Sequence, residues 1–116
     1  MPNGWGGIYE KFLDALASAI GGLAVGALKD YKDSVIADGL AFANSMKSDL
    51  QKWTAQLTTG DMTPGDVEFL LKGKRDLATL IALKEKGLAK VALDKFYSDL
   101  IQVIAGTAGK FFPLAK

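Results

Sequence analysis

The sequence contains no cysteine and no histidine. Without cysteine, the chain forms no disulfide and offers no thiolate to a metal ion. Without histidine, it lacks the commonest metal ligand and general base, and no nucleophile can be activated by an imidazole. The carboxylates form no catalytic pair in the sequence. We therefore predict a protein that is not an enzyme, with no catalytic residue, cofactor, metal site or small-molecule substrate.

Long apolar runs are missing as well. Residues 15–28 (ALASAIGGLAVGAL) carry no charge, but a membrane-spanning helix needs about 20 apolar residues. Glu10 and Asp14 precede this segment, where a secretory signal peptide would be basic. The sequence therefore predicts neither a signal peptide nor an ordinary membrane span. A location in the cytoplasm or in a virion is favoured, and association with a membrane is the alternative.

No charge of one sign dominates, since the net charge is +1. Such a chain has no overall field that attracts nucleic acid, so we expect no nucleic-acid partner. The charge is divided between the halves, however. Residues 1–66 carry five basic and eight acidic side chains, a net charge of −3, and residues 67–116 carry nine and five, a net charge of +4. Opposite signs favour antiparallel pairing of the two halves or head-to-tail contact between copies. The alternative interpretation is that the charges simply form two ordinary solvated faces.

Only three prolines interrupt the chain, and the strongest break in the pattern is residues 58–65 (TTGDMTPG). Thr63 can act as an N-cap, Pro64 suits the first helical position, and Asp66 follows the cap by three residues. This combination predicts a helix that starts at Pro64. We predict a single all-α domain over residues 1–116, with one helix over about 8–57, a turn over 58–65, a second helix over about 64–106 and an apolar tail over 107–116.

Apolar residues recur along both predicted helices with spacings that favour lengthwise pairing. The first helix shows a heptad pattern, which is typical of helices that pack side by side. The second helix fits an 11-residue repeat, which keeps a helix nearly straight. We predict an antiparallel helical hairpin about 60 Å long. Its seam would consist of Ile36, Ala43, Met46, Leu50 and Trp53 from the first helix and Leu70, Leu77, Ile81, Leu88, Ala92 and Val103 from the second.

Small residues recur every four positions at Ser18, Gly22 and Gly26. On one helix, this spacing lets two backbones approach closely, in water or in lipid. A kink near Gly21–Gly26 is also predicted, because glycine disfavours the helix. The hairpin would bring this segment and the apolar C-terminal segment to the same pole. The predicted self-association or membrane face consists of Ser18, Ile20, Gly22, Leu23, Gly26, Phe111 and Phe112.

A two-helix rod buries one face of each helix and leaves a thin core. The remaining apolar stripe needs a second subunit, a lipid surface or a larger assembly to cover it. The sequence therefore predicts a structural subunit that self-associates into a helical bundle, as a virion, secretion or filament component. One alternative is a membrane-active hairpin that inserts its glycine-rich pole. Another is a soluble helical adaptor that binds a partner protein.

Overall fold

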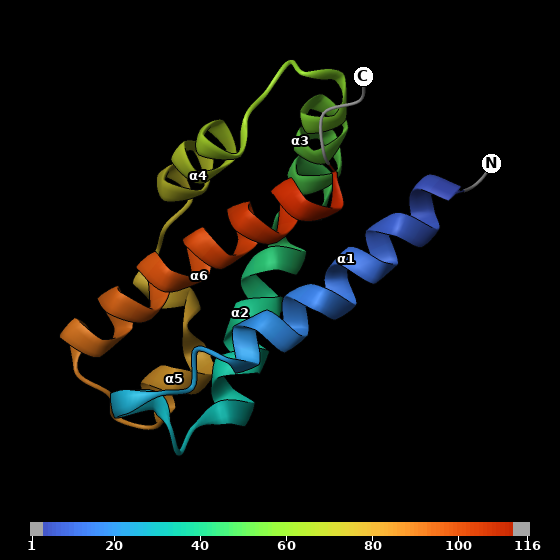
Figure 1. Ribbon diagram of the computed structural model, residues 1–116. Helices are drawn as coiled ribbons and strands as arrows, with labels where there is room; N and C mark the ends of the chain where they lie inside the picture. The colour runs from blue at the N-terminus through green and yellow to red at the C-terminus, as the bar shows by residue number, and fades with distance from the viewer. Residues whose placement is uncertain (1–3, 113–116) are drawn as a thin grey trace.

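The computed structural model describes the backbone of residues 4–112 and the side chains of residues 9–112. Within this range the chain is all-α and folds into six packed α-helices (Figure 1). The elements are α1 (Gly4–Gly21), η1 (Gly26–Leu28, a 3₁₀ helix), α2 (Lys32–Ser45), α3 (Lys47–Thr59), α4 (Pro64–Gly73), η2 (Leu77–Thr79, a 3₁₀ helix), α5 (Ile81–Glu85) and α6 (Lys90–Phe111). The predicted all-α class is therefore confirmed.

The two-helix hairpin, in contrast, is not formed, because each of the two predicted long helices is interrupted. The first ends at Gly21, inside the stretch where the sequence predicted a kink, and Gly26 has a left-handed backbone (φ +58°). It is interrupted again at Met46 (φ −117°, ψ 26°), between α2 and α3. The longest dimension is 46 Å, shorter than the predicted rod of about 60 Å.

The second predicted helix is divided into α4, η2, α5 and α6, and contacts with α6 explain the first division. Arg75, just after α4, donates hydrogen bonds to the carbonyl and to Oδ1 of Asp94, at 3.0 and 2.9 Å. Its guanidinium carbon lies 5.6 Å from the centre of the Tyr97 ring. The Tyr97 hydroxyl is 2.9 Å from the Thr79 hydroxyl. These contacts hold the segment between α4 and α5 across α6.

The start of α4 follows the prediction. The Thr63 hydroxyl accepts a hydrogen bond from the N–H of Asp66 at 3.2 Å, and the Asp66 carboxylate accepts one from the N–H of Thr63 at 3.0 Å. This reciprocal pair is a capping box, with Pro64 at the first helical position. The predicted helix start at Pro64 is confirmed.

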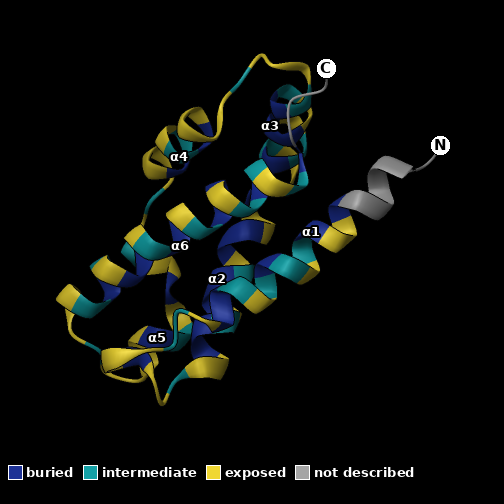
Figure 2. Cartoon of the chain, in the orientation of Figure 1, coloured by how far each residue is buried: buried dark blue, intermediate teal, exposed yellow. Residues whose placement is uncertain are grey.

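Helix α6 is the centre of the molecule, since it contacts α1, α3, α4 and η2. In Figure 2 the inner faces of α2 and α6 are dark blue, with exposed residues on their outer faces. The buried positions of α6 follow the three- and four-residue spacing of an ordinary amphipathic helix. They are Leu93, Phe96, Tyr97, Leu100, Ile101, Ile104, Ala105 and Ala108.

Most of the predicted seam residues are buried or half-buried, and the core is made by residues from all six helices. In the first half of the chain Ala43, Met46, Leu50 and Trp53 are buried and Ile36 is half-buried. The 11-residue repeat is wrong for the second half, because the helix on which it depends is interrupted. Ile81 is 64 % exposed. The other predicted positions are only half-buried, namely Leu70, Leu77, Leu88, Ala92 and Val103.

Candidate self-association surface

The predicted self-association residues lie at two separate places along α6. At its carboxyl end, the ring of Phe12 in α1 lies 6.3 Å from that of Phe111 and 5.6 Å from that of Phe112, measured between ring centres. The segment after α1 lies instead against Ala92 and Phe96, in the first half of α6. At about 1.5 Å per residue, Phe96 and Phe112 are roughly 24 Å apart along the helix. The predicted residues Leu23 and Gly26 therefore do not meet Phe111 and Phe112 at one pole.

The small-residue ladder is not formed either. It requires one continuous helix from Ser18 to Gly26, whereas α1 ends at Gly21. Ser18, Gly22 and Gly26 are exposed, but they do not share a helix face. Of the other predicted residues, Ile20 and Phe112 are buried in the core, and Leu23 and Phe111 are half-buried.

A close approach of two helices does exist, at a glycine outside the ladder. A Cβ atom placed on Gly39 in α2 would lie 2.6 Å from Cγ2 of Ile20 and 3.3 Å from Cδ1 of Leu100. Real Cβ atoms do not come this close to another carbon. Gly39 therefore lets α2 pack tightly against α1 and α6 inside one chain, which is the role that the sequence analysis gave to Gly22 and Gly26.

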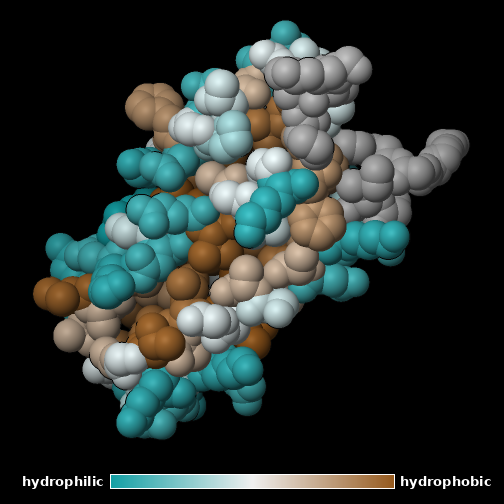
Figure 3. All heavy atoms as spheres, viewed as in Figure 1, coloured by the Kyte–Doolittle hydropathy of each residue, from teal (hydrophilic) through white to brown (hydrophobic). Residues whose placement is uncertain are grey.

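An apolar pocket of about 120 Å³ lies between the segment after α1 and the first half of α6. Val25 lines it and is 64 % exposed. Val91 is 79 % exposed and lies one helical turn before Lys95, which also lines the pocket. We call this region the valine surface, and it consists of Leu23, Val25, Ala27, Val91 and Ala92. In Figure 3, apolar atoms reach the surface over the start of α6.

The charges at the valine surface neutralise each other. Lys95 and Asp99 line the pocket, and Nζ of Lys95 lies 2.9 Å from Oδ2 of Asp99. They are four residues apart on α6, so the pair forms along one face of the helix. This pair gives the rim no net charge. A second copy of the surface could therefore approach it without like-charge repulsion.

A second apolar feature lies on α4. The Phe69 side chain is 75 % exposed, beside an open groove of about 480 Å³ that Leu70, Lys72 and Lys74 also line. Both lysines are already near carboxylates in the same chain. Lys72 lies 3.3 Å from Glu68, and Lys74 lies 3.7 Å from Asp49 in α3.

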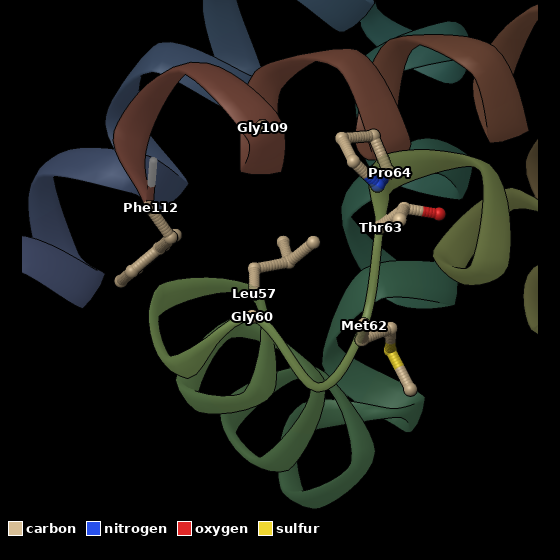
Figure 4. Close-up of a pocket in the computed structure, with 7 residues that line it drawn as sticks. All are labelled: Leu57, Gly60, Met62, Thr63, Pro64, Gly109 and Phe112. Atoms are coloured by element: carbon tan, nitrogen blue, oxygen red, sulfur yellow. The ribbon is translucent and has the colours of Figure 1, made fainter. Parts of the chain in front are cut away.

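A third pocket, of about 240 Å³, lies beneath the carboxyl end of α6. Figure 4 shows Leu57, Pro64 and Phe112 around it, with the connection from α3 to α4 as its other wall. A Cβ atom on Gly109 would lie 3.0 Å from Cγ of Pro64, so a larger residue there would require a small shift of the proline ring. Helix α6 continues to Phe111, past the predicted helix end near residue 106. Residues 113–116 of the predicted apolar tail lie outside the described residues.

Metal-binding clusters and membrane-spanning helices are absent from the described residues. None of their carboxylates gather in a group of three or more that could hold a metal ion. No helix among residues 4–112 is long and apolar enough to cross a bilayer. Burial raises the pKa of Tyr9, whose hydroxyl has no hydrogen-bond partner among the described residues. The polar side chains with specific contacts, such as Asp38 and Arg75, hold helices together.

Comparison with known proteins adds no relative. No protein-family model matches the chain, and no similar protein was found among curated proteins or solved structures.

Proposed function

We propose that this protein is a non-enzymatic assembly subunit that associates with copies of itself through the valine surface. The observation that supports this proposal is an apolar pocket lined by the highly exposed Val25, with the highly exposed Val91 next in the sequence to Ala92 of its lining. Single exposed apolar residues are common on proteins, whereas a contiguous group marks an interaction site. Val25 and Ala92 line this pocket from segments far apart in the sequence, so the fold itself creates the group.

A second copy of the chain is the partner that this surface fits best. Most assemblies of identical subunits are symmetric, and in a two-fold contact the same patch meets itself. Self-contact requires a patch without net charge, which the Lys95–Asp99 pair provides. The net charge of the chain, +1, is also too small to keep copies apart. Contact between two valine surfaces would cover both valines and fill both pockets.

Phe69 supports a second candidate function, a helical adaptor that binds a partner protein. Exposed aromatic side chains are frequent centres of binding energy at protein interfaces. Phe69 is 75 % exposed on a helix that packs on α6 with its other face. The membrane-active alternative would instead place the exposed apolar residues on a bilayer surface.

The experiment is size exclusion coupled to light scattering over a range of protein concentrations, in plain buffer and in mild detergent. We expect the wild type to exceed the monomer mass of 12.3 kDa in plain buffer. Val25→Glu and Val91→Glu should return it to that mass, because each places a carboxylate where two copies meet. Phe69→Glu is the matched control and should leave the oligomer unchanged. Circular dichroism checks that each variant keeps its helices.

Three outcomes would contradict self-association through the valine surface. A wild-type monomer at every concentration up to about 1 mM would leave only contacts too weak to build an assembly. Dissociation by Phe69→Glu, with both valine variants unaffected, would move the interface to α4. Aggregates that resolve only in detergent would support the membrane-active alternative.

A further inference from the structure

A polar cleft of about 310 Å³ lies at the amino end of α2, on a different part of the chain from the valine surface. Residues 29–34 line one side, and Lys86, which follows α5, lines the other. Since α2 and α5 pack on each other, the cleft is built by two elements that are about 50 residues apart in the sequence.

Backbone N–H groups at this end of α2 lack acceptors. The N-cap residue Tyr31 makes no side-chain capping bond. The first hydrogen bond of the helix runs from the N–H of Val35 to the carbonyl of Tyr31, at 2.8 Å. The N–H groups of Lys32, Asp33 and Ser34 therefore find no hydrogen-bond acceptor in the described part of the chain. Such groups carry the partial positive charge of the helix end.

Ser34 adds a hydroxyl to the same place. This residue lines the cleft and is only 8 % exposed. Its hydroxyl makes no hydrogen bond to any residue between Tyr9 and Phe112, although four other hydroxyl residues of α2 and α3 bond to carbonyls of their own helix. This unpaired hydroxyl, on a residue that is otherwise nearly buried, is available to a polar group in the cleft.

The side-chain charges favour an anion by a small margin. Lys29, Lys32 and Lys86 line the cleft together with Asp30 and Asp33. None of these five makes an ion pair within 4.0 Å among the described residues, so the three ammonium groups are available to a ligand. The cleft thus has one positive charge in excess, in addition to the helix end.

We propose that this cleft binds a phosphate group, held by the free N–H groups of Lys32, Asp33 and Ser34 and by the Ser34 hydroxyl, with Lys29 and Lys86 at the rim. Several N–H donors that converge at a helix amino end are a common phosphate-binding arrangement. A phosphate accepts hydrogen bonds on several oxygens, so it can use these donors together. The two aspartates weaken the site, and we expect a dissociation constant on the order of 1 mM.

The test is a titration of the ¹⁵N-labelled protein with inorganic phosphate, with the ionic strength held constant by chloride and amide shifts followed by NMR. The amide signals of residues 32–34 should move and saturate. The start of α6 is an internal control, because its N-cap Ala89 also makes no side-chain capping bond. Shifts that grow linearly, or that are equal at residues 90–92, would show an adventitious ion only and would overturn the proposal.

Variants separate a built site from general attraction. Ser34→Ala and Lys86→Ala should each weaken phosphate binding by about fivefold, whereas Lys110→Ala at the far end of α6 should not. Asp33→Asn should tighten binding by a similar factor, because it removes a like charge from beside the ligand. If Ser34→Ala and Lys110→Ala bind phosphate equally, the site is not the one proposed.

The source of the phosphate group is resolved with vesicles. Sedimentation with vesicles that contain phosphatidic acid, compared with vesicles of phosphatidylcholine alone, tests a lipid headgroup. Binding that Ser34→Ala reduces would assign the cleft to that headgroup. Saturable binding of inorganic phosphate without vesicle binding would assign it to a dissolved phosphate compound. Failure of both arms overturns the site and leaves self-association through the valine surface untouched.

Discussion

Oδ2 of Asp38 accepts a hydrogen bond of 2.7 Å from the backbone N–H of Leu83. Its other oxygen accepts one of 3.0 Å from the N–H of Ala82. Asp38 is in α2 and only 4 % exposed, so one carboxylate caps the start of α5 from a different helix. The N-cap residue of α5 itself, Leu80, makes no side-chain capping bond. The short helix α5 depends on Asp38 for these two donors.

Replacing Asp38 by alanine should lower the free energy of unfolding by about 2 kcal/mol, because two backbone N–H groups, one buried and one partly buried, lose their acceptors. Asp38→Asn should cost less, since an amide oxygen can still accept one of the bonds. The control is Asp76→Ala, which removes an exposed carboxylate that accepts from the N–H of Ala78 in η2. Urea denaturation gives the three values. Equal losses for Asp38→Ala and Asp76→Ala would show that burial of the cap is unimportant.

Two glycines inside helices allow a paired test of the α1–α2 contact. Gly39→Ala should destabilise the protein by about 1–3 kcal/mol, because its new methyl group would overlap Ile20. Gly106→Ala in α6 meets no atom within 4 Å and should raise stability by up to about 1 kcal/mol through helix propensity. Thermal unfolding of both variants measures the contrast. A Gly39→Ala variant as stable as Gly106→Ala would show that α1 and α2 are not packed closely at this position.

Local signals in the sequence predicted part of this fold. The capping box at Thr63 depends on residues within four positions of each other, so the helix start can be predicted from this short stretch of sequence alone. The break after Gly21 was foreseen for a similar reason, since glycine itself disfavours a helix. The heptad pattern also selected buried residues, such as Leu50 and Trp53.

The remaining breaks depend on contacts between distant residues, which periodicity cannot reveal. The segment after α4 is held by Arg75 against Asp94 and Tyr97, about 20 positions away. The 11-residue repeat assumed one continuous helix and therefore missed the simple pattern of residues 93–108. One signal was overlooked. Asp38 lies three residues after Val35 and four before Phe42, so a carboxylate lies on the apolar face of a helix and needs a partner.

The valine surface could not be predicted from the sequence for the same reason. Leu23 and Gly26 belonged to the predicted self-association face of the first helix, whereas Ala92 belonged to the predicted seam of the second. The fold brings them to one pocket because α1 ends early and its following segment crosses α6. Val25 and Ala92 line one pocket only through that crossing.

Tyr9 predicts a pH dependence of stability. Burial raises its pKa above 10.0, so the unfolded chain loses the phenol proton at a lower pH than the folded one. The contribution of Tyr9 to the free energy of unfolding is fully present below pH 10. It is lost as the pH rises towards the pKa of Tyr9 in the folded protein, by at most about 1.4 kcal/mol per pH unit. Tyr9→Phe has no phenol proton to lose and therefore lacks this loss of stability. Near neutral pH the variant should be at least as stable as the wild type, because the Tyr9 hydroxyl that it removes has no hydrogen-bond partner among the described residues. Urea denaturation of both proteins from pH 7 to pH 11 tests this. A constant difference between them would contradict the raised pKa.

The neighbours Leu80 and Ile81 provide a test of the observed start of α5. Leu80 is 0 % exposed and Ile81 is 64 % exposed, whereas the 11-residue repeat placed Ile81 in the seam and Leu80 outside it. Leu80→Ala should therefore destabilise the protein by about 2–5 kcal/mol by leaving a cavity, and Ile81→Ala should change stability by less than about 0.5 kcal/mol. The two substitutions remove similar numbers of carbon atoms, so their difference reports burial alone. Urea denaturation of both variants gives the order, and a larger loss for Ile81→Ala would favour the continuous second helix of the hairpin over the interrupted one.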